Sequence, residues 1–123
     1  MEVRELENDR FAAARKGSEA AGCHVLLKGY RSVVAFENRC MVIHAGNSAL
    51  AKAGTGDVLT GMIGALFSQG MDTLQGAATA AYIHGRMADE WVRLGNDKRA
   101  LAASDIAQQL PQLLTRIAGG AIL

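Results

Sequence analysis

The 123-residue sequence predicts one α/β domain, with a helix first, about three short strands next and three helices after them. Three observations carry this prediction. Apolar residues recur at helical spacing among charges near the start, short β-branched segments fill residues 23–44, and long apolar runs rich in small residues fill the second half. A chain of this length forms one domain at most and buries roughly two thirds of its unfolded surface.

The first expected element is an amphipathic helix over residues 2–21. Val3, Leu6 and Phe11 recur there among charged residues, at a spacing that places them on one face of a helix. Gly22 follows this run, and glycine is the residue that most often ends a helix.

Three short strands are expected next. The apolar segment CHVLLKG (23–29) is typical of a buried strand, and SVVAFE (32–37) is rich in β-branched residues. The polar turn ENRC leads into CMVIH (40–44), so residues 32–44 are expected to form a hairpin.

The second half predicts three helices. An apolar, nearly uncharged run over residues 55–69 predicts a helix buried on most sides and ended by Gly70. A second helix is expected from about residue 72 to Gly95, where small residues allow close helix packing. A third helix is expected to begin with Ser104 as its N-cap and Asp105 in its first turn, because a serine hydroxyl caps free N–H groups and a carboxylate favours the positive end of the helix dipole. Pro111 is expected to kink or divide this helix, because proline lacks the backbone N–H.

Composition excludes several classes of partner. Thirteen basic and twelve acidic residues leave a formal charge of +1, so nucleic acid and anionic membranes are not expected partners. The first twenty residues are charged and lack an apolar signal segment, and no apolar run approaches the roughly 20 residues that span a bilayer. Cys23 and Cys40 have no metal-binding spacing, so we expect buried free thiols in a reducing, cytoplasmic setting.

The segment AKAGTGDVLTG (51–61) contains the main functional signal. Gly54, Thr55 and Gly56 precede an apolar helical run, where glycines let a ligand approach the backbone closely. A glycine-rich turn at a helix N-terminus presents free N–H groups and the positive end of the helix dipole. These residues therefore predict an anion site, with phosphate as the usual ligand.

Asp57 has two candidate roles at the end of this turn. It caps the helix, which is worth about 1 kcal/mol, or it accepts a proton from a hydroxyl that attacks a bound phosphate. Spacing alone favours capping. The segment is neither a P-loop nor a Rossmann fingerprint, since neither GK[ST] nor G-x-G-x-x-G is present.

Three segments together resemble one enzyme family. VLLKGYRSVV, GNSALAKAGTGDVLTGMIGALFSQG and AAYIHGRMADE occur in the order and spacing of the ADP- or ATP-dependent NAD(P)H-hydrate dehydratases. The middle segment resembles that family's GNxxMAxGGTGDVLTGxIxxLxAQG stretch, with Leu50 and Ala53 at positions where Met and Gly are common. The resemblance covers about residues 23–110.

The resemblance implies a fold and a position within it. The family's domain is a ribokinase-like three-layer α/β/α fold about twice this length. Residues 1–123 then correspond to its C-terminal half, without the N-terminal half that provides most of the parallel sheet. Alone, such a half exposes a sheet edge and an apolar helix face, which favours a homo-oligomer.

The resemblance also implies site residues. The LKG stretch would contact the nucleotide, with Lys28 neutralising phosphate charge and Gly56 contributing its backbone. Asp57 would contact the substrate and act as the base toward its ring hydroxyl, and Asn47 would help order the phosphates or Mg²⁺. The implied nucleotide-binding residues are Lys28, Gly29, Tyr30, Arg31, Ser32, Asn47 and Gly56, beside Gly54 and Thr55 of the anion site.

The implied reaction is repair of hydrated NAD(P)H (NAD(P)HX). ADP or ATP, with Mg²⁺, would phosphorylate the ring hydroxyl, and elimination of phosphate would restore NAD(P)H. Two alternatives remain at this point: a ribokinase-like kinase of the hydroxymethylpyrimidine or thiazole type, and a non-catalytic nucleotide-binding fragment. His84 and Asp89, in the HGxxxD pattern, are expected to serve helix packing.

Overall fold

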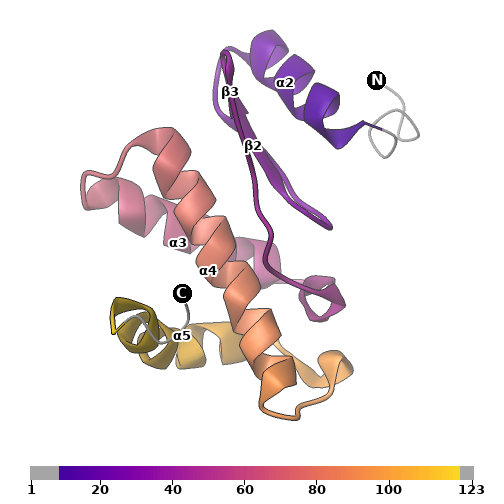
Figure 1. Cartoon of the computed structure of the whole chain (residues 1–123), viewed down its shortest axis with the longest axis vertical. Coiled ribbons are helices and arrows are strands. Elements are labelled where there is room, and N and C mark those ends of the chain that lie inside the picture. Colours follow the sequence, from indigo (N-terminus) through magenta and orange to yellow (C-terminus); the bar gives the residue numbers. More distant parts are fainter. Residues whose placement is uncertain (1–8, 120–123) are drawn as a thin grey trace.

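The computed structural model describes residues 9–119, and its elements follow the expected order (Figure 1). They confirm an α/β fold with one helix, three strands and then three helices; the expected helical residues 2–8 lie outside the described part. The elements are α2 (Arg10–Ala21), β1 (Val25–Leu27), β2 (Val33–Phe36), β3 (Arg39–Val42), the 3₁₀ turn η1 (Ser48–Leu50), α3 (Thr55–Ser68), α4 (Thr73–Arg93), the 3₁₀ turn η2 (Lys98–Ala100) and α5 (Ala103–Ala118).

The three strands form an antiparallel sheet in the order β1-β2-β3. The expected hairpin is present: Phe36 pairs with Arg39 across a two-residue turn in which Glu37 adopts a positive φ of 52°. Strand β2 is buried on both faces. Val33 and Ala35 pack with Ala14 of α2, whereas Val34 packs against α3 and α4 on the other face.

The sheet therefore lies between two helical layers, with α2 on one face and α3 and α4 on the other (Figure 1). Small residues let α4 approach both α3 and the sheet closely. The larger core cluster consists of Val34, Ile43, Leu59, Leu74, Ala77, Ala78, Ala80 and Ala81. A second cluster joins α4 to α5 through residues that include Met87, Ile106 and Leu113.

Helix α3 is less buried than its sequence predicts. Only Thr55 and Leu59 are buried among its residues, and Phe67 near its end is 38% exposed. The prediction failed because an apolar helix is covered only where another element lies against it. In the described part of the chain, α4 and α5 cover one side of α3. Gly70 follows the helix with a φ of 86°, as expected for the glycine that ends it.

Helix α5 corrects two expectations. Its N-cap is Ala102 rather than Ser104, because Asp105 reaches back and accepts a hydrogen bond of 2.8 Å from the backbone N–H of Ala102. Asp105 thus lies in the first turn as expected. The helix also runs unbroken through Pro111, which lies on its exposed side, where water can hydrogen-bond the carbonyl that proline leaves unpaired.

A charge cluster holds α5 against α4. Glu90 of α4 is 5% exposed and accepts hydrogen bonds from Arg93 on its own helix and from Arg116 on α5. The hydrogen bond from Arg93 and the hydrogen bond from Arg116 lower the pKa of Glu90 to about 2, against the opposing effect of burial.

None of the helices within residues 9–119 is long and apolar enough to cross a membrane.

Candidate functional site

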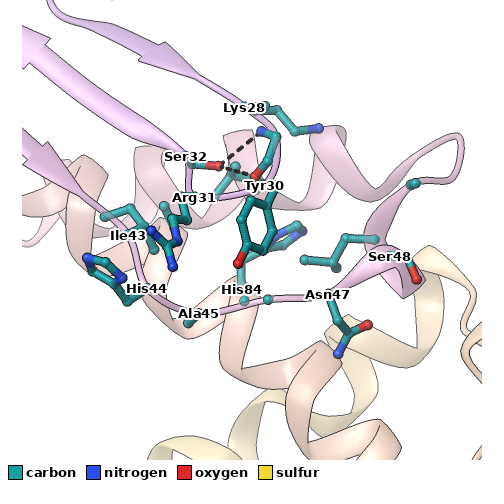
Figure 2. Close-up of a pocket in the computed structure, with 17 residues that line it drawn as sticks. Lys28, Tyr30, Arg31, Ser32, Ile43, His44, Ala45, Asn47, Ser48 and His84 are labelled. Carbon is teal, nitrogen blue, oxygen red and sulfur yellow. Dashed lines mark hydrogen bonds between the residues drawn. The ribbon is translucent and has the colours of Figure 1, made fainter. Parts of the chain in front are cut away.

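A cavity of about 550 Å³ opens between the β1–β2 turn, the segment after β3, and helices α3 and α4 (Figure 2). It gathers residues that are far apart in the sequence. Of the residues expected at the nucleotide site, those that line it are Lys28, Gly29, Tyr30, Arg31, Ser32 and Asn47. Gly54, Thr55, Gly56 and Asp57 do not line it.

The β1–β2 turn is held in a defined shape by its own hydroxyl and by α2. The Ser32 hydroxyl lies 3.2 Å from both the N–H and the carbonyl oxygen of Gly29, so it closes the turn. The Arg10 guanidinium donates to the carbonyl oxygens of Leu27 (3.0 Å) and Lys28 (2.6 Å). These contacts fix where the turn presents its side chains.

Two side chains of this turn stand over the cavity. Tyr30 is 79% exposed, and Figure 2 shows its ring lying over the opening of the cavity. The Arg31 guanidinium lies 5.3 Å from the centre of that ring, and Arg31 itself adopts a positive φ of 56°. An exposed aromatic ring with a cation on it is suited to contact a flat, anionic ligand.

The N-terminus of α3 has the free amides that an anion site needs. Gly54 caps the helix with a φ of 87°, and the first helical hydrogen bond runs from Val58 N–H to the Gly54 carbonyl at 3.3 Å. The preceding N–H groups, at positions 55–57, have no hydrogen-bond partner within residues 9–119. They are the orphan donors of a helix start, at the positive end of its dipole.

Lys28 joins the turn to this helix start. Its ammonium nitrogen lies where a side chain on residue 56 would be: a Cβ added to Gly56 would be 2.7 Å from Lys28 Nζ. The absence of a side chain at Gly56 thus lets the lysine charge reach the backbone of α3. A cation and several free N–H groups at one place form a phosphate-binding arrangement.

Asp57 is exposed and does not cap α3. Its carboxylate forms no hydrogen bond within the described part of the chain, so the capping role favoured by spacing alone is wrong. The helix instead begins at a left-handed glycine without a side-chain cap. The carboxylate is therefore free of internal partners in the first turn of α3, where the sequence predicts an anion site.

Asn47 forms two hydrogen bonds within the chain. Its Oδ1 accepts from the N–H of Ala49 at 2.9 Å, and its Nδ2 donates to Asp89 at 3.1 Å. Figure 2 shows this side chain pointing away from Tyr30. One Nδ2 hydrogen remains for a ligand, since the amide carries two.

His84 is the main residue that the sequence did not assign to the site. It lines the cavity while only 3% exposed, and its Nε2 lies 2.9 Å from the Thr55 carbonyl oxygen. Burial lowers the pKa of His84, and the nearby Lys28 charge lowers it further against the effect of the Thr55 hydrogen bond. The HGxxxD pattern was the sequence signal for placing His84 at the site, because it puts His84 and Asp89 on neighbouring turns of one helix.

The described residues also contain two free cysteines, Cys23 and Cys40. The expectation that they are buried is wrong, because Cys23 is exposed and Cys40 is only partly buried. Within residues 9–119 no cluster of three or more His, Cys, Asp and Glu side chains is arranged to hold a metal ion.

Comparison with known proteins decides the family. The model of the carbohydrate-kinase-like NAD(P)H-hydrate dehydratase family matches residues 1–112. The chain belongs to the NAD(P)H-hydrate dehydratase family. This finding confirms the resemblance carried by the GTGDVLTG segment and favours the dehydratases over the small-molecule kinases that share the glycine-rich helix start.

Curated relatives of the chain are named as NAD(P)H-hydrate dehydratases or NAD(P)H-hydrate repair enzymes. The ADP-dependent (S)-NAD(P)H-hydrate dehydratase of Neisseria meningitidis is 38% identical over 116 residues, which are 94% of this chain and 39% of the relative. The bifunctional NAD(P)H-hydrate repair enzyme of Moorella thermoacetica is 38% identical over 113 residues, 91% of this chain and 21% of that protein. The chain thus spans about two fifths of the single-function relative and about one fifth of the bifunctional one.

Solved structures confirm the fold. The ADP/ATP-dependent NAD(P)H-hydrate dehydratase of Bacillus subtilis, co-crystallised with ATP and Mg²⁺, has a TM-score of 0.87 and 34% identity; the match covers 93% of this chain and 41% of that one. A ribokinase-like superfamily protein of Enterococcus faecalis has a TM-score of 0.74 at 22% identity, covering 90% and 38%. The chain therefore has the fold of the part of these ribokinase-like structures that it matches.

Proposed function

We propose that residues 1–123 form the C-terminal portion of a ribokinase-like dehydratase domain, and that this domain restores NAD(P)H from its hydrated form. The portion binds ADP or ATP together with Mg²⁺. The relatives' names and the ATP/Mg²⁺ of the Bacillus subtilis structure support this proposal. Because this chain spans only part of those proteins, the activity is proposed for the domain as a whole.

One observation carries the proposal: the Lys28 ammonium lies against the backbone of Gly56, beside the unpaired amides that begin α3. A terminal phosphate of the nucleotide fits this place, because it receives charge-assisted hydrogen bonds from the lysine and N–H donors from the helix. The turn from Lys28 to Ser32, which lines the adjacent cavity, contacts the rest of the nucleotide.

Asp57 is the proposed base of this reaction. Its carboxylate removes the proton from the ring hydroxyl of NAD(P)HX, and the hydroxyl oxygen attacks the terminal phosphoryl group of the nucleotide. An O–P bond forms and the bond to the shortened nucleotide breaks. The phosphate then leaves with the C–O bonding electrons, the neighbouring ring carbon loses a proton, and the C=C bond formed between these two carbons gives NAD(P)H and inorganic phosphate. The lack of internal partners leaves this carboxylate available for the proton.

Mg²⁺ fits this site as part of the nucleotide. The described residues provide no three-ligand carboxylate or histidine cage, and Mg²⁺ is usually held by substrate phosphates with one or two carboxylates. Bound in that way it neutralises phosphate charge. Lys28 and the amides of α3 then have the task of orienting the terminal phosphate.

Analysis of the products tests the reaction. A dehydratase converts NAD(P)HX and ATP or ADP into reduced nicotinamide and free phosphate, whereas a kinase leaves a stable phosphorylated substrate. Asp57→Asn should abolish turnover and leave nucleotide binding in place, because it removes the base and keeps the shape. Accumulation of a phosphorylated nicotinamide would contradict the proposal, and binding without turnover would indicate the non-catalytic alternative for this chain.

We also propose that the chain by itself forms a homo-oligomer. Within residues 9–119, β1 pairs only with β2 and so leaves one edge unpaired, and α3 exposes one of its faces. Sedimentation at several concentrations measures the association.

We propose a cytoplasmic location for the protein. Both cysteines are free thiols, which supports a reducing compartment.

A further inference from the structure

One face of helix α4 contacts both loops beside the phosphate site. His84 and Gly85 line the cavity, and Asp89 lies one turn further along the helix, next to the loop that follows β3. The reaction proposed above gives none of these three residues a role. Their contacts divide between the loop at 44–47 and the start of α3.

His84 fixes the first turn of α3. Its Nε2 lies 2.9 Å from the Thr55 carbonyl oxygen, and Nε2 must carry the hydrogen because a carbonyl only accepts. The Thr55 hydroxyl lies 2.8 Å from the Leu50 carbonyl oxygen and 2.9 Å from that of Lys52, so residues 50–55 are tied to the same point. His84 and Thr55 are 3% and 1% exposed, which shields these bonds from water.

Gly85 lets the other loop lie directly on the helix. A Cβ at this position would be 2.5 Å from both the carbonyl carbon and the oxygen of Ala45. Gly46 faces it: a Cβ there would be 3.4 Å from the Gly85 Cα, and Gly46 has a φ of 112°. The backbones of helix and loop therefore touch at a distance that leaves no room for a side chain on α4.

Asp89 holds the same loop through both of its oxygens. Oδ2 accepts from the N–H of Gly46 at 3.0 Å, and Oδ1 accepts from Asn47 Nδ2 at 3.1 Å. Asn47 then accepts from the N–H of Ala49 at 2.9 Å. The amide orientation of Asn47 is thereby determined, since a flipped amide would set its NH₂ against the Ala49 N–H and its oxygen against the Asp89 carboxylate.

We propose that His84, Gly85 and Asp89 are positioning residues that lock the loop at 44–47 and the first turn of α3 into the shape that receives the nucleotide. The three act through other residues: His84 Nε2 and both Asp89 oxygens contact the two loops, and Gly85 leaves the space that the loop at 44–47 occupies. The effect on nucleotide affinity rests on the proposed function, whereas the locking of the two loops does not.

Residue-resolved hydrogen exchange of the 123-residue chain, measured without nucleotide, tests the locking. Asp89→Asn loses one hydrogen bond to Asn47, so exchange at the Gly46 and Ala49 amides should accelerate about tenfold. His84→Phe lacks the donor and should accelerate exchange at Val58. Glu90→Gln is the matched control: it lies next to Asp89 on the same helix but faces α5, and it should lower the Tm without selective change at these amides.

Conservative replacements separate positioning from general stability. His84→Gln keeps a donor at the Nε2 position and should restore most of the protection at Val58. In the double variant Asp89→Asn with Asn47→Asp, the amide and carboxylate change places, so the Asn side chain donates to the Asp and both N–H groups keep an acceptor. Protection at Gly46 and Ala49 should return in this double variant.

Titration of ATP with Mg²⁺ into the same proteins gives the second readout. The dissociation constant should rise about tenfold in Asp89→Asn and in His84→Phe, and stay unchanged in Glu90→Gln. Exchange rates in Asp89→Asn and His84→Phe that match those of Glu90→Gln would overturn the proposal, as would a swapped pair that stays unprotected. If the wild-type chain binds no ATP or ADP, the proposed function fails, and the exchange comparison still decides whether these residues lock the loops.

Discussion

At the scale of single residues, the Lys28 ammonium is central to the proposed phosphate site, because it lies against Gly56 at the start of α3. Lys28→Met keeps the length of the side chain and removes its charge. Since hydrogen bonds to charged groups contribute about 1.5–3 kcal/mol, we expect the dissociation constants of ADP and ATP to rise about tenfold to a hundredfold. Calorimetric titration measures this change.

The matched control for that experiment is Lys16→Met. Lys16 is an exposed lysine of α2, outside the residues that line the cavity, and its replacement changes the net charge by the same amount. Equal loss of affinity in both variants would mean that net charge attracts the nucleotide, and it would remove the specific role of Lys28.

His84 should make the stability of the fold depend on pH. Burial lowers its pKa, so between the ordinary histidine value near 6.5 and the lowered folded value the unfolded chain binds more protons than the folded chain. The free energy of unfolding should therefore fall as the pH drops through this range. Denaturant unfolding at a series of pH values measures this dependence. The free energy of unfolding of His84→Gln should change less with pH in this range than that of the wild-type chain. An equal change in both proteins would exclude His84 as the origin of the pH dependence.

At the scale of elements, Glu90 joins α4 to α5. Its pKa of about 2 in the folded chain, compared with an ordinary value of 4.5, adds stability above pH 4.5 that is lost as the pH falls toward 2. Glu90→Gln should lower the free energy of unfolding by about 1–2 kcal/mol near pH 7, discounted because Arg93 and Arg116 are partly exposed. The difference between the two proteins should shrink at low pH; a constant difference would contradict the assignment.

Two helix glycines should respond to alanine in opposite directions. Gly85→Ala places a Cβ 2.5 Å from the Ala45 backbone and should destabilise the fold by about 2 kcal/mol or more. Gly61→Ala, in α3, meets nothing within 4 Å and should stabilise it by about 0.5–1 kcal/mol through helix propensity. Thermal unfolding of both variants checks this, and two changes of the same sign would contradict the close contact of α4 with its loop.

The elements themselves were largely predictable from local chemistry. Gly22, Gly70 and Gly95 each follow the end of a helix with a positive φ, and the β-branched residues of β2 indicated its strand. The N-cap of α5 and the continuity of this helix through Pro111 were not predictable. The first depends on how Asp105 reaches back to the Ala102 N–H, and the second on which side of α5 faces water. The exposed side of α3 was missed because burial depends on what covers a helix, not on the helix alone.

At the scale of the whole molecule, the sequence could indicate the site only where the site is continuous in the chain. The stretch from Lys28 to Ser32, which the resemblance assigns to the nucleotide, is continuous in the chain and lines the cavity. The bonds from Asp89 to Asn47, 42 residues apart, and from His84 to Thr55, 29 residues apart, arise from packing of α4 and leave only a weak spacing pattern in the sequence. The free carboxylate of Asp57 likewise required the structure, since spacing favoured a cap.

The most direct test of the central claim is calorimetric titration of ADP and ATP, with Mg²⁺, into the 123-residue chain and its Asp57→Asn variant. The proposed phosphate site consists of Lys28 and the amides that begin α3, and it does not include the Asp57 carboxylate, so both proteins should bind nucleotide with saturation and with similar affinity. A folded chain that binds neither nucleotide would contradict a phosphate site assembled within these residues.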